Sequence, residues 1–152
     1  MLGRYVTFLG VLDCGARTCS LAPLPFGKTG KMMHYRKLGS SSLNVSPICL
    51  GGNVFGWTVD EPQSFKLLDG FIDSGFNFID TADMYSRWVQ DNRGGESETI
   101  IGNWLKKRGG RDKVIVATKF GMEMAPNKVG LSPDYMMQAV EDSLQRLQTD
   151  YI

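Results

Sequence analysis

The sequence has few residues that could form disulfide bonds or bind metals. It contains three cysteines and one histidine among 152 residues. Cys14, Cys19 and Cys49 form no CxxC pair, and an odd number of cysteines does not make a disulfide framework. We therefore predict a protein of the reducing cytoplasm, without a metal site. Cys49 lies in an apolar run with no cationic neighbour in sequence, which favours a small buried hydrophobic residue over a nucleophile.

The sequence also lacks an excess of charge of either sign and lacks a long hydrophobic run. Lys and Arg number 17 and Asp and Glu 16, so the formal net charge is +1. This balance argues against nucleic acid or an anionic membrane as a partner, and no segment approaches the length of a membrane span. The basic cluster within residues 106–113 is interpreted as a solvated helix end. The hydrophobic content of 42% suffices for one globular core.

Residues 1–32 differ in character from the rest of the chain. They combine a short apolar patch and scattered basic residues with a single acid, Asp13. Gly10 interrupts the patch, Asp13 ends it and no small-residue cleavage site follows, so a signal or transit peptide fits less well than the alternatives. We interpret residues 1–32 as a disordered extension or an upstream misread start, and residues 33–152 as the folded unit.

The order of elements after residue 33 is predicted from hydrophobic spacing and turn residues. Residues 34–46 favour a β-hairpin, with His34 on its surface. Three short apolar runs then alternate with helical patterns. The predicted strands cover residues 48–50, 76–79 and 114–118, the predicted helices lie between Asp60 and Gly75, over 97–108 and from Pro133 onward, and a fourth strand starts at 151–152.

The last predicted helix has a clear start and a predicted inward face. Ser132 and Pro133 suit its N-cap and first position. The apolar stripe at helical spacing consists of Met136, Val140, Leu144 and Leu147.

Alternating strands and helices predict an α/β fold of βαβ units around a parallel sheet. A (β/α)₈ TIM barrel needs about 250 residues, more than this chain contains. We therefore predict the N-terminal half of a (β/α)₈ TIM barrel, preceded by a β-hairpin and truncated at the fourth strand. Such a chain would be a fragment or truncated product of a larger enzyme.

Ionisable side chains follow two of the predicted strands. Asp80 closes one strand, and Tyr85 follows in the next loop. Lys119 closes the neighbouring strand, and the carboxyl ends of parallel strands face a common mouth. A phenol, with a reference pKa of about 10, needs a nearby ammonium to release its proton readily at neutral pH. Lys119 could supply that charge while Asp80 holds the lysine in place, which favours carbonyl reduction with Tyr85 as proton donor.

Each of these residues also has a purely structural explanation. Asp80 could be a turn or capping residue, Tyr85 an exposed loop aromatic, and Lys119 a side chain that extends along the surface to reach solvent. The functional hypothesis depends on their shared position at one end of a sheet.

From residue 33 onward the sequence resembles the aldo-keto reductases, NADP(H)-dependent barrel enzymes that reduce aldehydes and ketones. Residues 75–82, Gly-Phe-Asn-Phe-Ile-Asp-Thr-Ala, with Glu-Thr-Ile-Ile-Gly at 98–102, are similar to the first signature of the family. Ala-Thr-Lys at 117–119 is similar to the strand that carries its lysine. The hairpin resembles the plug that closes the barrel floor.

The resemblance implies a cofactor, a substrate class and a set of residues. The cofactor would be NADP(H) and the substrate a small aldehyde or ketone. Asp80, Tyr85 and Lys119 would be three members of the catalytic tetrad. The cofactor would pass beside Gly51, Gly52 and Asn53, with Asp80 near the nicotinamide.

Two departures from the family pattern matter. Residues 86–95 lengthen the loop after Tyr85, and Trp88 in this loop could either line a substrate pocket or pack the loop. The tetrad histidine of the family follows the counterpart of residues 150–152, and the clamp for the cofactor phosphates belongs to the second half of the barrel. We therefore expect the chain alone to be inactive, poorly soluble and weak in cofactor affinity.

Two other interpretations of the function remain open. A Rossmann dehydrogenase would place pyrophosphate on the glycine loop and ribose on Asp80, but the glycines at 51, 52 and 56 do not match GxGxxG. A non-catalytic cofactor-binding or regulatory module related to the aldo-keto reductases is the second alternative.

Overall fold

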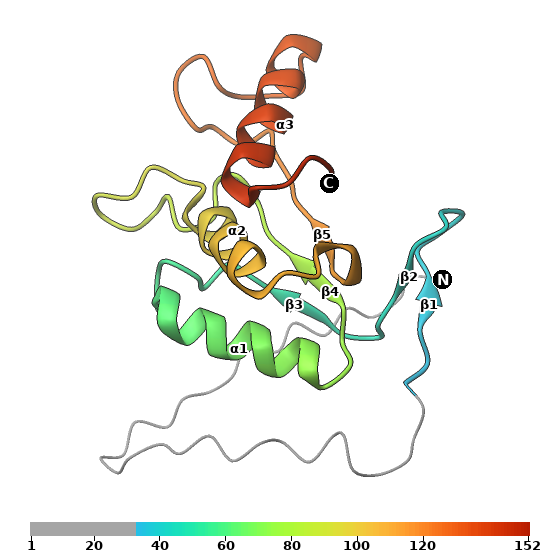
Figure 1. The fold of residues 1–152 in the computed structure, drawn as a ribbon. Coiled ribbons are helices and arrows are strands. Elements are labelled where there is room, and N and C mark those ends of the chain that lie inside the picture. The colour runs from blue at the N-terminus through green and yellow to red at the C-terminus, as the bar shows by residue number, and fades with distance from the viewer. Residues whose placement is uncertain (1–32) are drawn as a thin grey trace, which may run out of the picture.

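A computed structural model describes residues 33–152, so the predicted extension over 1–32 lies outside the described residues. Three short parallel strands form the centre of the molecule (Figure 1). They are β3 (Cys49–Gly51), β4 (Phe78–Asp80) and β5 (Ile115–Ala117), in the order β3-β4-β5. The register aligns Gly51 with Asp80 and Asp80 with Ala117, so all three strands end at one level. The predicted parallel α/β arrangement is confirmed for these strands, as a partial fold rather than a closed barrel.

Three helices connect or follow the strands. They are α1 (Glu61–Asp73), α2 (Glu96–Arg108) and α3 (Pro133–Leu147), and the short 3₁₀ helix η2 (Arg111–Lys113) precedes β5. The side chain of Asp60 caps α1 by accepting a hydrogen bond from the Gln63 amide at 2.9 Å. Ser132 caps α3 as predicted. No helix in the described part of the chain is both long and apolar enough to cross a membrane.

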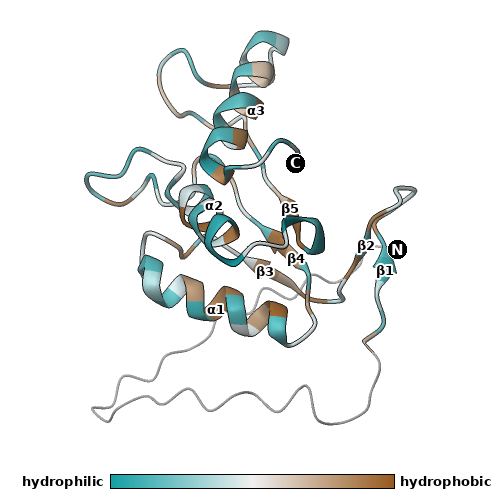
Figure 2. Ribbon diagram, in the orientation of Figure 1, coloured by the Kyte–Doolittle hydropathy of each residue, from teal (hydrophilic) through white to brown (hydrophobic). Residues whose placement is uncertain are grey.

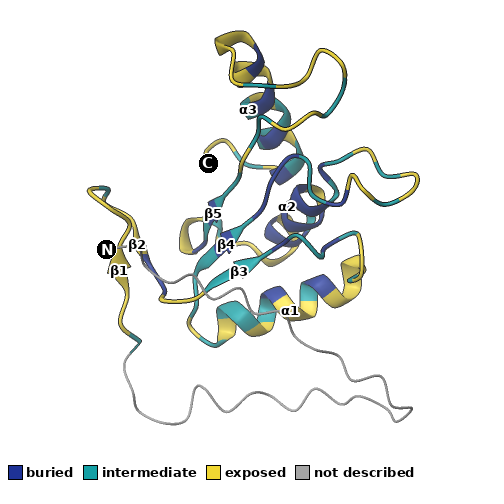
Figure 3. Cartoon of the chain, turned by 180° about the vertical axis from the view of Figure 1, so that it is seen from behind, coloured by how far each residue is buried: buried dark blue, intermediate teal, exposed yellow. Residues whose placement is uncertain are grey.

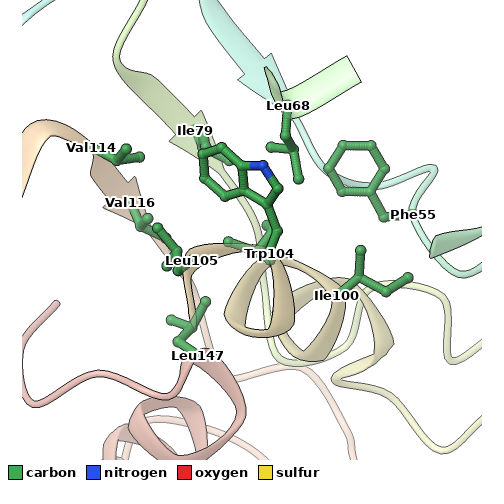
Figure 4. Close-up of a cluster of buried hydrophobic side chains, with 10 residues drawn as sticks. Phe55, Leu68, Ile79, Ile100, Trp104, Leu105, Val114, Val116 and Leu147 are labelled. Atoms are coloured by element: carbon green, nitrogen blue, oxygen red, sulfur yellow. The ribbon is translucent and has the colours of Figure 1, made fainter. Parts of the chain in front are cut away.

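The core lies between the strands and the inner faces of α1 and α2 (Figure 4). Ile79 on the central strand, Leu68 on α1 and Ile101 on α2 are completely buried. Trp104 fills the space between the two helices and is 1% exposed. Its indole N–H donates to Asp69 Oδ1 of α1 at 2.9 Å. Figure 2 shows hydrophobic residues on the central strands, and Figure 3 shows these strands as half-buried or buried and the outer side of α1 as exposed.

The buried face of α3 is rotated by about one residue from the apolar stripe that the sequence predicted to face inward. The buried residues are Tyr135, Ala139, Ser143 and Leu147, so of the predicted stripe Leu147 is buried and Val140 and Leu144 are half-buried. Met136 is 42% exposed. The reason is close backbone packing, because a Cβ at Gly102 of α2 would lie only 2.1 Å from the carbonyl oxygen of Arg146. Such an approach requires small side chains on the contacting face of α3, and hydropathy alone does not reveal this.

The predicted fourth strand is not formed. Tyr151 and Ile152 have no strand structure and are 48% and 47% exposed. A strand forms only when its backbone pairs with a neighbouring strand, and residues 151–152 pair with none of the described strands. The guanidinium of Arg111 donates to the carbonyl oxygen of Tyr151 at 2.9 Å. The same guanidinium lies 4.0 Å from the centroid of the tyrosine ring.

The predicted hairpin is present as β1 (Arg36–Lys37) and β2 (Asn44–Val45), which pair antiparallel. His34 precedes it and is exposed, as predicted. Asn77 connects the hairpin to the sheet. Its side chain accepts a hydrogen bond from the Ser46 amide at 2.8 Å and donates one to the carbonyl oxygen of Asn44 at 2.9 Å. Asn77 precedes β4, so the hairpin covers the amino ends of the strands (Figure 1).

Candidate active site

The carboxyl end of the sheet brings together the three predicted catalytic residues. Asp80 is the last residue of β4, Tyr85 follows in the next loop, and Lys119 lies two residues beyond β5. The Lys119 ammonium donates to Asp80 Oδ1 at 2.8 Å and to Oδ2 at 2.9 Å. The Tyr85 hydroxyl donates to Asp80 Oδ2 at 3.1 Å. Asp80 therefore bridges the phenol and the ammonium, which fits the convergence expected from strand ends.

The Lys119 ammonium also contacts the sheet and the tyrosine ring. It donates to the carbonyl oxygen of Thr81 at 2.7 Å and lies 4.5 Å from the centroid of the Tyr85 ring. Burial disfavours the lysine charge, but hydrogen bonds and attraction from Asp80 and Tyr85 outweigh this and raise the pKa of Lys119. The lysine is therefore a fixed cation beside the phenol at neutral pH.

Cys49 on β3 lies close enough to Asp80 and Lys119 for their charges to affect the pKa of its thiol. Burial, followed by repulsion from Asp80, raises the pKa of the thiol from 9.0 to about 11, although Lys119 acts in the opposite direction. Such a thiol is almost entirely protonated at neutral pH, which supports the reading that Cys49 is no nucleophile. Cys49 was predicted to be a small buried hydrophobic residue, and the structure shows it half-buried.

The predicted cofactor residues Gly51, Gly52 and Asn53 lie beside Asp80 at the end of β3. The Gly52 amide donates to the Asp80 carbonyl oxygen at 2.7 Å. A Cβ at Gly52 would lie 2.8 Å from the hydroxyl oxygen of Ser97, which itself donates to the Gly52 carbonyl at 2.7 Å. Close packing of the α2 start against the strand therefore explains the glycine at position 52. Asn53 is half-buried.

A buried carboxylate behind the site was not identified as functional from the sequence. Glu98 on α2 is completely buried and accepts hydrogen bonds from Thr118 at 2.5 Å and from Arg146 of α3 at 2.7 Å. Thr118 directly precedes Lys119, so Glu98 anchors the chain segment that carries the lysine. The sequence signal is weak, because an acid in the first turn of a helix is also the usual solvated residue.

Asp83 is a second buried acid that the sequence did not single out. Its side chain is 2% exposed, and Oδ1 has no hydrogen-bond partner among the described residues. Burial, then repulsion from Glu98, raises the pKa of its carboxyl group. Its amide donates to the Lys119 carbonyl oxygen at 3.0 Å, which ties the exits of β4 and β5 together.

Comparison with known proteins assigns the chain to a family. The sequence profile of the Aldo/keto reductase family matches residues 47–152. The chain belongs to this family. The resemblance noted from the signature residues is thereby confirmed, and oxidoreductases are its relatives.

Individual relatives differ in how much of their own length this chain covers. An uncharacterized 11.2 kDa protein in the crtE 3'region of Pseudescherichia vulneris is 50% identical over 100 residues, which are 65% of this chain and 97% of that protein. The aryl-alcohol dehydrogenase [NADP(+)] of Phanerodontia chrysosporium is 41% identical over 150 residues, covering 86% of this chain and 37% of the dehydrogenase. This chain therefore spans little more than a third of the length of that enzyme.

The fold is also similar to that of solved aldo-keto reductases. The holo form of aldo-keto reductase AKR11C1 from Bacillus halodurans is 38% identical, with a TM-score of 0.65. The match covers 80% of this chain and 38% of the solved one.

Proposed function

We propose that the chain forms the proton-donating half of an NADP(H)-dependent reductase site for small aldehydes or ketones. The observation that carries the proposal is the bridge from Tyr85 through Asp80 to Lys119. Residues 33–152 would be the N-terminal half of a (β/α)₈ barrel of the aldo-keto reductase type, working in the cytoplasm. Family membership and the oxidoreductase relatives support this reading.

Tyr85 would act as the general acid. Its hydroxyl now donates to Asp80, and it would turn this hydrogen bond toward the carbonyl oxygen of a substrate. Transfer of the proton leaves a phenolate, which the Lys119 ammonium over the ring would stabilise. Asp80 would keep that ammonium in position with its two short hydrogen bonds.

The residues at the strand ends fit a nicotinamide at the open face of the site. The side chains of Lys119 and Asp80 are 49% and 36% exposed, so a planar ring can reach them. Bound NADPH would supply a hydride to the carbonyl carbon, and with the Tyr85 proton this completes the alcohol. Asp80, with Gly51, Gly52 and Asn53, would line that end of the cofactor. The preference for NADP over NAD is supported by the name of the Phanerodontia chrysosporium relative.

A non-catalytic cofactor-binding module is the second candidate. It is favoured by the 11.2 kDa relative, a short protein that this chain matches over 97% of its length. Such a module would bind NADPH without turning over a carbonyl substrate.

The deciding experiment replaces Tyr85 by Phe in the natural gene product and follows NADPH oxidation with a panel of aldehydes and ketones. We expect kcat to fall by about 10²- to 10⁴-fold, the usual contribution of general acid catalysis. Tyr35→Phe is the matched control, since Tyr35 donates to the Gly75 carbonyl oxygen on the hairpin side of the sheet. Undiminished turnover by Tyr85→Phe would remove Tyr85 as proton donor. NADPH binding without turnover of any carbonyl by the unaltered protein would favour the module.

A further inference from the structure

Asp80 and Lys119 each have a threonine as their neighbour in the chain. Thr81 directly follows Asp80, and Thr118 directly precedes Lys119. Successive side chains of an extended chain point to opposite sides of a sheet, so the threonines lie on the opposite side from the charged pair. Thr81 is completely buried and Thr118 half-buried, whereas the side chain of Lys119 is 49% exposed. Any displacement of a threonine therefore also moves the charged side chain next to it.

Two consecutive residues in the first turn of α2 bind these threonines. The hydroxyl groups of Ser97 and Thr81 are hydrogen-bonded at 2.9 Å, and Thr118 donates to Glu98 Oε1 at 2.5 Å. Ser97 and Glu98 are both completely buried. Ser97 also donates to the carbonyl oxygen of Gly52 at 2.7 Å, so the two side chains together reach the carboxyl ends of all three strands. We call Ser97 and Glu98 the anchor pair.

The orientation of Glu98 is fixed by a residue of α3. Arg146 Nε donates to Oε2 at 2.7 Å, which leaves Oε1 to accept from Thr118. Each carboxylate oxygen thus has its own partner, and the side chain cannot turn without losing one of them. Apolar residues would hold α2 on the sheet equally well, because a buried ion pair adds little net stability. Hydrogen bonds are short-ranged and directional, so they also fix how far apart the strand ends lie.

We propose that the anchor pair consists of positioning residues that set the separation of Asp80 and Lys119 for proton donation by Tyr85. This inference rests on the proposed reductase function and adds residues that act on the reaction without touching substrate or cofactor. The Lys119 ammonium donates to the two oxygens of Asp80 at 2.8 and 2.9 Å. A shift of one strand end by about 1 Å would break these hydrogen bonds, and misplacement of this size can lower a rate by about 100-fold.

Removing one anchored hydroxyl should lower kcat of the natural gene product. We expect Thr118→Val, which keeps the shape of the side chain, to reduce kcat for carbonyl reduction by about 10- to 100-fold and to change KM by less than about twofold. Ser97→Ala, which releases Thr81, should act in the same direction. Thr118→Ser keeps the hydroxyl and should recover most of the loss.

Ser64→Ala is the matched control for a simple loss of stability. Ser64 is completely buried like the anchor pair, and its hydroxyl donates to the carbonyl oxygen of Asp60 at 2.7 Å at the start of α1. This change removes a buried hydrogen bond without releasing Thr81 or Thr118. It should leave kcat within about twofold of the parent value.

The placement of Lys119 can also be measured without turnover. The titratable groups close enough to interact with its charge are Asp80, Tyr85, Asp83 and Cys49. Burial opposes the charge, but the contacts with Asp80 and Tyr85 outweigh it and raise the pKa of the ammonium. Acetic anhydride reacts with the free amine, and the free fraction rises about tenfold for each unit by which the pKa falls.

Acetylation at pH 8 should therefore report the loss of the anchor. We expect Lys119 to react about 3- to 10-fold faster in Thr118→Val than in the parent, because the displaced ammonium loses Asp80. Mass spectrometry of peptides measures the rate relative to Lys37, an exposed lysine of the hairpin. Thr118→Ser and Ser64→Ala should leave the relative rate unchanged.

The outcomes separate this inference from the proposed function. Unchanged kcat and unchanged acetylation in both Thr118→Val and Ser97→Ala would overturn the anchor pair and leave the role of Tyr85 intact. An equal fall of kcat in Ser64→Ala would also overturn it, since loss of stability would then explain the effect. Faster acetylation of Lys119 in Thr118→Val, in a protein that reduces no carbonyl, would remove the reductase proposal and support the control of Lys119 by the anchor pair.

Discussion

At the scale of single residues, the site depends on buried charges that sit behind the exposed ones. Asp80 and Lys119 are partly open to solvent, whereas Glu98 behind them is completely buried. Glu98 is paired with Arg146, whose side chain is 23% exposed, and with the hydroxyl of Thr118. A buried ion pair adds little net stability, but removing one partner leaves the other charge uncompensated.

Replacing Glu98 by Ala should therefore destabilise the fold strongly. We expect the free energy of unfolding to fall by about 3 kcal/mol, the low end for a buried pair because Arg146 is partly exposed. Urea unfolding followed by circular dichroism measures the change. Asp142→Ala is the control, since Asp142 pairs with Lys128 nearer the surface, with side-chain exposures of 24% and 47%, and should cost less than about 1 kcal/mol. Equal effects of the two changes would contradict this account of Glu98.

Cys49 offers a prediction about pH. Its thiol pKa is raised from 9.0 to about 11, so the thiolate fraction at pH 8 is roughly 100-fold smaller than for an ordinary thiol. We expect iodoacetamide to alkylate Cys49 about 100-fold more slowly in the folded protein than in urea, with the folded rate still rising from pH 8 to pH 10. Mass spectrometry of a variant carrying Cys14→Ser and Cys19→Ser isolates this thiol. Equal folded and unfolded rates at pH 8 would contradict the raised pKa.

At the scale of elements, α2 is the helix that contacts both α1 and α3. Its Trp104 belongs to the core and donates to Asp69 of α1, and its Gly102 lets the backbone of α3 approach. The basic residues that end α2, Lys106, Lys107 and Arg108, are exposed, as predicted for a solvated helix end. Arg108 also donates to Asp69 and Asp73 of α1, both at 2.6 Å, so this end of α2 is joined to α1 at the surface.

A pair of helix glycines tests the close packing of α2 and α3. Gly102→Ala would place a Cβ 2.1 Å from the Arg146 carbonyl oxygen, so we expect a loss of about 1–3 kcal/mol despite the better helix propensity of Ala. Gly70→Ala in α1 meets nothing within 4 Å and should stabilise by about 0.5–1 kcal/mol. The free energies of unfolding of both variants against the parent provide the measurement. A gain for Gly102→Ala would show that the helices can separate without cost.

At the scale of the whole molecule, the sheet and α3 leave apolar surface uncovered. Within residues 33–152, β3 and β5 each pair on one side only. Met122 and Leu131, between β5 and α3, and Met137 on α3 are 62%, 76% and 67% exposed. Exposed strand edges and apolar side chains promote association between chains.

We therefore expect the 152-residue chain, expressed by itself, to associate in a concentration-dependent way. Light scattering after size-exclusion chromatography should give masses above 16.9 kDa that rise with loading. Leu131→Lys combined with Met137→Lys should lower the average mass by adding charge to the uncovered surface. A monomer at every concentration that unfolds cooperatively would contradict this prediction.

The sequence predicts the positions of most elements and the grouping of Asp80, Tyr85 and Lys119, because the signals for both are local in the chain. Strand and helix periods are read over a few neighbours, and an ionisable residue at the end of an apolar run lies at the mouth whatever the rest of the chain does. Asp80 and Lys119 belong to this class. Parallel pairing aligns β4 and β5 so that both side chains emerge at one level, and the prediction of their meeting needed no further information.

Only the tertiary structure decided how side chains from distant segments share space. It brought the backbone of α3 close to Gly102 of α2, and it joined Arg111 to the carbonyl oxygen of Tyr151. It also buried Glu98 against Arg146, 48 residues away, and set Trp57 against Trp88. Such contacts depend on the packing of whole elements, which no local pattern of residues encodes.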